Sequence, residues 1–142
     1  METLKDIFVP YEIAVQLKEI GFYEPCMAMY NQRKEIEIGL NEVVKQANFV
    51  RQDLLLVSDF NEINSHHIGS KPFCSAPTYE QVKKWFREKG VESSLFTEDG
   101  YYYYRGSKGD KFLFSGTEDT YKQAQEQLIY KLIEIYKNEC KR

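Results

Sequence analysis

A stretch of two-residue periodicity constrains the fold of this chain more than any other feature. Three segments in it are typical of β-strands: Val91 to Thr97, Tyr101 to Arg105, and Lys111 to Ser115. The first two are joined at Glu98-Asp99-Gly100, which is a strong hairpin signal, and the last two at a glycine-rich turn from Gly106 to Asp110. Because short turns join neighbouring antiparallel strands, the sequence predicts a three-stranded meander.

Two helices are predicted to flank this meander. From Pro77 to Lys89 apolar residues recur three and four positions apart, so they share one face of a helix that opens with proline. The last helix is predicted from Thr117 or Thr120 to Asn138, since Thr120 and Gln123 have the spacing of a capping box. Its predicted buried stripe consists of Tyr121, Ala124, Leu128, Leu132 and Ile135.

The N-terminal half is less regular. Pro10 to Ile20 is predicted to be a helix, and Cys26 to Asn31 a strand. Ile36 to Leu40 alternates apolar and polar residues, which favours another strand. Val43 to Phe60 fits either a helix or a strand, and residues 59–75 are predicted to form a long loop because they are rich in turn residues.

Length and composition indicate one domain spanning residues 1–142. A chain of 142 residues has too little length for two full cores, and 42% hydrophobic residues suffice for one. The aromatic share of 15% is high, and aromatic side chains bury large areas. We therefore expect an α+β fold: an antiparallel sheet of three to five strands, a long C-terminal helix packed on one face, and two shorter helices.

Charge and cysteine content indicate the compartment and exclude some partners. The net charge of −3 argues against a dedicated nucleic-acid-binding protein. Three cysteines, Cys26, Cys74 and Cys140, cannot all be paired within one chain, and the N-terminus lacks the apolar core of a signal peptide. The longest apolar run, Leu54 to Val57, is too short to cross a bilayer. We expect a cytoplasmic protein with free thiols and no membrane partner.

Three blocks of residues are distinctive by identity rather than by composition. They are Phe8 to Glu12 with Gly21-Phe22 and Glu24 to Cys26; Ala76 to Gln81 with Trp85 to Arg87; and Tyr121, Ala124 and Leu132 to Glu134. In these blocks, which cover less than half of its length, the chain resembles a group of short, uncharacterised proteins encoded by bacteriophages and mobile elements. That group has no assigned activity, so the resemblance implies a setting and no mechanism.

The predicted order from Pro77 to Lys137, helix, three antiparallel strands, helix, looks like a double-stranded-RNA-binding domain. That family reads RNA through a basic cluster opening its last helix and a histidine-bearing loop between its first two strands. Here the last helix opens with Thr120 to Ala124, which contains one lysine, and the corresponding loop, Glu98-Asp99-Gly100, is acidic. We retain the topology as an expectation and discount the RNA-binding function.

No local motif for catalysis, metal binding or cofactor binding is recognisable. His66-His67 and Cys74 match no zinc-site spacing. Asp59 to Asn64 begins like a calcium loop, but Asn64 and Ser70 stand where glycine and glutamate are required. Gly106 to Gly109 lacks the glycine spacing and the following helix of a phosphate-binding loop. We expect no metal ion and no cofactor.

Two surfaces are candidates for binding. In the tyrosine strand, Tyr101 and Tyr103 must point to one side of the sheet and Tyr102 and Tyr104 to the other. One of these pairs, with Arg105 at its edge, is predicted to belong to a binding surface, and the sequence does not choose between the pairs. The alternative is a nucleic-acid surface on the second helix, formed by Lys83, Lys84, Trp85, Arg87 and Lys89.

These features favour a non-enzymatic binding protein that contacts another protein or a small ligand through an aromatic surface. Nucleic-acid binding through the basic helix and the aromatic strand is the first alternative. The second is an enzyme without a local motif, whose acidic groups come together from distant segments. The partner and the oligomeric state are not determined by the sequence.

Overall fold

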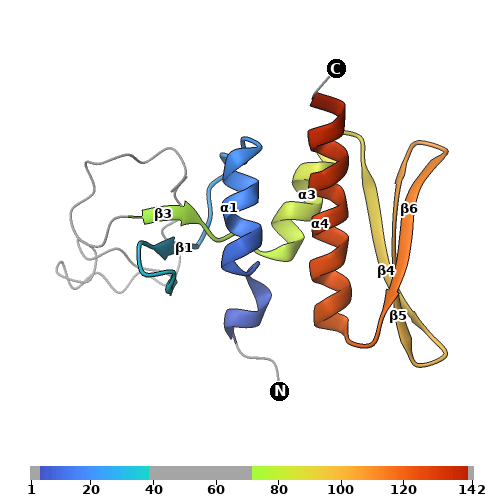
Figure 1. The fold of residues 1–142 in the computed structure, drawn as a ribbon, viewed down its shortest axis with the longest axis horizontal. Helices are drawn as coiled ribbons and strands as arrows, with labels where there is room; N and C mark the ends of the chain where they lie inside the picture. The colour runs from blue at the N-terminus through green and yellow to red at the C-terminus, as the bar shows by residue number, and fades with distance from the viewer. Residues whose placement is uncertain (1–3, 39–71, 141–142) are drawn as a thin grey trace. The chain divides into compact units, whose positions relative to one another are not determined.

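The computed structural model describes residues 4–38 and 72–140 of the chain (Figure 1). The chain divides into two compact units, Met1–Thr78 and Tyr79–Arg142. Each unit contains a three-stranded antiparallel sheet, with strand order β2-β1-β3 in the first and β4-β5-β6 in the second. The predicted α+β class is therefore confirmed. Among the described residues no helix combines the length and the apolarity needed to span a membrane.

The first unit combines short helical segments with a small sheet. Its elements are η1 (Leu4–Ile7), α1 (Tyr11–Glu19), β1 (Ala28–Asn31), β2 (Ile36–Ile38) and β3 (Pro72–Ser75). The predicted helix and the strand at Cys26 to Asn31 are confirmed in position, with shorter bounds. The strand predicted from Ile36 to Leu40 is present as far as Ile38, and its last two residues lie outside the described residues. Pro10 is the residue before α1 rather than its first helical residue, and Gly21 adopts φ of 92°, the left-handed conformation that ends a helix.

Part of the predicted loop at residues 59–75 is a strand. Pro72–Ser75 forms β3 and pairs antiparallel with β1, with Tyr30 opposite Cys74. This pairing joins segments more than forty residues apart in sequence, so turn-rich local composition could not reveal it. Residues 59–71 and the segment from Val43 to Phe60 lie outside the described residues.

The core of the first unit contains two thiols and a tyrosine hydroxyl. Cys26 and Cys74 are free and fully buried. The Tyr30 hydroxyl donates a hydrogen bond of 2.6 Å to the carbonyl of Val9. Burial raises the pKa of Tyr30 to about 12 and that of Cys74 to about 11, because a buried site disfavours the charged form.

The second unit has the predicted helix–meander–helix order. Its elements are α3 (Tyr79–Glu88), β4 (Glu92–Glu98), β5 (Tyr101–Lys108), β6 (Lys111–Glu118) and α4 (Tyr121–Cys140). Helices α3 and α4 lie on the same side of the sheet, and α4 runs alongside the strands (Figure 1). The predicted long C-terminal helix on one face of an antiparallel sheet is confirmed.

The two turns of the meander differ from each other. Asp99 and Gly100 both adopt positive φ, 52° and 82°, which is the two-residue hairpin turn that the sequence predicts. The second turn is shorter than predicted, because Gly106 to Lys108 belong to β5. Gly106 lies opposite Phe114, whose ring would collide with any Cβ at Gly106. This glycine therefore makes room for an aromatic ring and does not mark a turn.

Helix α4 is capped and buried along most of its length. The Thr120 hydroxyl accepts a hydrogen bond of 3.1 Å from the Gln123 amide N and donates one of 3.0 Å to Oε1 of Gln123, so Thr120 is the cap and Thr117 belongs to β6. Of the predicted stripe, Tyr121 is exposed and Ile135 is half-buried. The buried face instead consists of Ala124, Gln125, Leu128, Ile129, Leu132 and Ile133.

Replacing Leu132 or Leu128 by alanine is expected to lower the free energy of unfolding by roughly 2–5 kcal/mol, because each change leaves a cavity beneath α4. Chemical denaturation measures the cost. Glu134→Ala, at an exposed position of the same helix, is the control and should cost less than about 0.5 kcal/mol. A similarly small cost at Leu132 would contradict the burial of this helix face.

The Cys74 thiol is expected to react slowly with Ellman's reagent in the folded protein. With a pKa of about 11, only about a thousandth of it is thiolate at pH 8, and the side chain is buried. The raised pKa values of Cys74 and Tyr30 also make the free energy of unfolding depend on pH, because the folded state holds these two protons more tightly than the unfolded state does. This contribution to stability is fully present below about pH 9, and it is lost as the pH rises through 11 to 12.

Stopped-flow absorbance compares reaction rates in the folded protein and in denaturant. Cys26→Ser and Cys140→Ser variants assign the phases to individual thiols. A Cys74 rate that is the same in both conditions would show that this thiol is accessible in the folded state.

Candidate binding surface on the open face of the second sheet

The tyrosine strand β5 sends its four rings to opposite faces of the sheet. Tyr104 is only 6% exposed, and the Tyr102 ring meets the ring of Tyr121, the first residue of α4, at a centroid distance of 5.9 Å. Tyr101 is 50% exposed, and Arg105 is exposed on the same face. The structure thus decides what the sequence left open: Tyr102 and Tyr104 face the helix, whereas Tyr101, Tyr103 and Arg105 lie on the opposite face.

Glycines allow the inner rings to pack flat across the sheet. Gly116 lies opposite Tyr104, and a Cβ at Gly116 would collide with the Tyr104 ring. Tyr104 also packs against Phe114 at a centroid distance of 6.3 Å. Burial raises the pKa of Tyr104, and the negative charge of Glu118 raises it further. Tyr104 is thus a core residue whose neutral hydroxyl is favoured.

The opposite side of the sheet is the open face, and strand register orders its side chains into rows. A central row contains Arg105 between two serines. A row on one side contains an aromatic pair and a threonine, and a row on the other side ends in an exposed phenylalanine. In strand order the rows are Phe96-Tyr103-Thr117, Ser94-Arg105-Ser115 and Glu92-Ser107-Phe112, with Glu98-Tyr101 next to the hairpin.

Aromatic rings dominate this open face. Phe96 and Tyr103 stack in parallel, with centroids 5.4 Å apart and 10° between their planes. Phe96 is 43% exposed and Phe112 is 57% exposed. We call the set Phe96, Tyr101, Tyr103, Arg105 and Phe112 the aromatic face.

Phe96 and Phe112 were not among the candidate residues of the sequence analysis. The position of Phe96 on this face could have been predicted from the hairpin. A two-residue turn at Asp99-Gly100 places Phe96 directly opposite Tyr103. Phe112 could not be placed in the same way. A register irregularity at Gly106/Ser107 shifts the pairing of β6, and local sequence does not show it.

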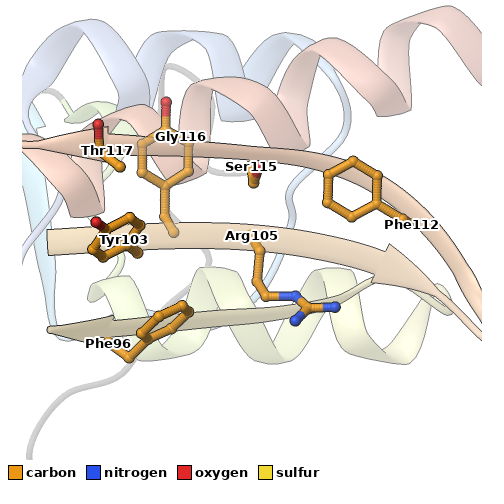
Figure 2. Close-up of a pocket in the computed structure, with 8 residues that line it drawn as sticks. Phe96, Tyr103, Arg105, Phe112, Ser115, Gly116 and Thr117 are labelled. Carbon is orange, nitrogen blue, oxygen red and sulfur yellow. The ribbon is translucent and has the colours of Figure 1, made fainter. Parts of the chain in front are cut away.

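A hollow of about 360 Å³ opens on the aromatic face. Figure 2 shows the stacked Phe96 and Tyr103 at one end, Phe112 at the other, and the Arg105 side chain between Phe96 and Phe112. The full lining is Phe96, Tyr103, Tyr104, Arg105, Phe112, Ser115, Gly116 and Thr117. Small residues of β6 line the hollow beside Arg105, because its partner there is Ser115 and the next residue is Gly116.

The charges around the hollow leave Arg105 available. Within the described part of the chain Arg105 forms no ion pair, and no carboxylate lies directly opposite it. Glu92 in the neighbouring row is engaged, with its Oε2 3.5 Å from Nε of Arg87. Glu98 lies beyond the Phe96-Tyr103 pair. The open face therefore presents one unpaired guanidinium among exposed rings.

The alternative surface on α3 does not assemble as the sequence suggests. Trp85 is 6% exposed, because its ring packs against Tyr136 of α4 at 5.3 Å. Lys89 Nζ lies 4.3 Å from the centre of the Trp85 ring and covers it further.

The other cations of α3 are also largely engaged. Lys83 pairs with Glu80 at 3.3 Å, and Arg87 pairs with Glu92. Lys84 is exposed. Because Trp85 lies on the side of α3 that packs against α4, its ring is not available for stacking with a base.

Potential metal ligands form no cluster in the part of the chain that the structure describes. In residues 4–38 and 72–140 there is no group of three or more histidine, cysteine, aspartate or glutamate side chains able to hold a metal ion. Cys74 is buried in the first unit. His66, His67 and the segment from Asp59 to Asn64 lie outside the described residues.

Serine replacements should separate the two faces of β5. Tyr102→Ser with Tyr104→Ser is expected to lower the free energy of unfolding by roughly 3–5 kcal/mol, because buried ring contacts are lost beneath α4. Tyr101→Ser with Tyr103→Ser, the matched control, should cost about 1 kcal/mol or less. Denaturant titration measures both, and equal large losses would mean that both faces of the strand are covered.

The chain matches no known protein family, and neither a curated protein nor a solved structure shows significant similarity to it.

Proposed function

We propose that this chain is a non-enzymatic binding protein whose aromatic face holds a segment of a partner protein. The observation that carries the proposal is the stack of the exposed Phe96 on the half-buried Tyr103, with Phe112 across a hollow from it. Contiguous exposed apolar patches are uncommon on monomeric proteins and often mark interaction sites.

The residue types on the aromatic face suit a protein interface. Aromatic residues and arginine are enriched at the centres of interfaces, where each contributes a large contact area. A tyrosine ring loses little rotamer entropy on binding, and its hydroxyl tolerates water when the partner is absent. The face is also preorganised, because the sheet beneath it is held by α4 on its other side.

The charge of the face favours a protein over a nucleic acid. Proteins that bind single-stranded DNA or RNA combine aromatic rings, on which the bases stack, with a positively charged groove that follows the phosphates. On the aromatic face Arg105 is the single cation, and the same side of the sheet carries Glu92 and Glu98. The net charge of −3 also disfavours binding to the phosphates of a nucleic acid.

The cellular setting forms part of the proposal. Cys26 and Cys74 are buried thiols, and such thiols persist in a reducing compartment, so we place the protein in the cytoplasm. The resemblance of three sequence blocks to uncharacterised proteins of bacteriophages and mobile elements leads us to propose an accessory role in such an element. Genes adjacent to the coding sequence would test this setting.

Selection of peptides from a random display library on the full chain tests the function. Peptides that bind are expected to lose at least about tenfold in affinity for Phe96→Ser with Tyr103→Ser, because that variant removes the stacked pair. Tyr23→Ser, which removes an exposed ring from the first unit, is the control and should bind like the unmodified protein. Calorimetry measures affinity, and denaturation confirms that each variant is folded.

Two results would contradict the proposal. One is that the selected peptides bind equally well to the Phe96-Tyr103 variant. The other is that single-stranded oligothymidylate binds through the same residues more tightly than any peptide, which would assign the aromatic face to nucleic acid.

A further inference from the structure

We infer that the hollow around Arg105 is a specificity site that takes a carboxylate side chain of the partner segment, with apolar or aromatic residues beside it. The inference rests on the proposed function and names the chemistry of the partner. In the rows of the aromatic face Arg105 lies between aromatic walls, and its two cross-strand neighbours are serines.

Small neighbours keep the guanidinium of Arg105 accessible from above. Ser94 and Ser115 are its direct cross-strand partners, and their side chains are too short to cover it. A glutamate at either position could pair with Arg105, because opposite charges in directly paired positions stabilise a sheet. With serines at these positions, the N–H donors of the Arg105 guanidinium remain open to a partner and are not paired with a carboxylate of the sheet.

Aromatic walls increase the strength of an ion pair made here. Phe96 and Tyr103 border the hollow on one side and Phe112 on the other, so a bound segment would exclude water from the guanidinium (Figure 2). Two parallel N–H donors of arginine match the two oxygens of a carboxylate, and such bidentate pairs are stronger than neutral hydrogen bonds. The rings meanwhile hold the neighbouring apolar side chains of the segment.

The remaining charges on this side of the sheet specify where the carboxylate binds. Glu92 is paired with Arg87, so it does not compete for Arg105. Glu98 lies at the far end of the face, beside Tyr101, and repels a second acidic group there. An acidic residue of the partner is therefore favoured at the centre of the face and disfavoured at the hairpin end.

The test uses the full chain and the tightest peptide from the display selection, synthesised with its acidic residue and with the corresponding amide. Affinities of both peptides are measured for the unmodified protein, Arg105→Gln and Lys84→Gln. The last variant is the matched control, because it removes one positive charge from an exposed site outside the aromatic face.

The acidic peptide is expected to bind the unmodified protein and Lys84→Gln about five- to tenfold more tightly than the amide peptide. Arg105→Gln should bind the two peptides equally, and raising the salt concentration should weaken only the pairs that contain both charges.

The inference is overturned if the selected peptides show no enrichment in acidic residues, or if the acid-to-amide change has the same effect on Arg105→Gln as on the unmodified protein. In either case the proposed function stands provided that binding still depends on Phe96 and Tyr103. Loss of that dependence would instead overturn the proposed function, and the inference with it.

Discussion

The packing of α4 against one face of the β4–β5–β6 sheet is the constraint on which the second unit depends. A three-stranded sheet needs an apolar face that is shielded from water, because successive side chains of each strand point to opposite faces. Leu128 and Leu132 of α4 are buried, as are Tyr104 and Phe114 of the sheet against which α4 packs. Once this face is buried, two-residue periodicity determines which residues stay outside.

That partition gives the two halves of the tyrosine strand different physical roles. Inner rings are held by glycines in neighbouring strands, which let the rings lie flat where a Cβ would collide. Within the described residues of the second unit no helix lies over the outer rings, and Phe96 and Tyr103 support each other by stacking. Exposed apolar area on such a surface is unfavourable in water, and covering it with a partner would be favourable for the same reason.

Prediction from sequence succeeded where local signals and tertiary structure agree. The hairpin at Asp99-Gly100 and the cap at Thr120 were both readable, because each depends on residues within four positions. Prediction failed where strand pairing or burial depends on residues that are distant in sequence. Strand β3 needs β1 as its partner, and the burial of Trp85 involves Tyr136 of α4, which lies far from it in sequence. Tyr121 was assigned to the buried stripe of α4, yet it lies at the exposed start of the helix.

Local sequence signals were enough to predict the class of fold, the helix–meander–helix order of the second unit, and the division of the four tyrosines into two alternating pairs. These follow from periodicity and turn chemistry, which act between residues close in the chain. Only the tertiary structure decided that Tyr101 and Tyr103 lie on the open face, that Phe96 and Phe112 join them, and that Arg105 stands unpaired between serines. The physical reason is that helix-to-sheet packing and cross-strand register are set by contacts between distant segments, which no local pattern specifies.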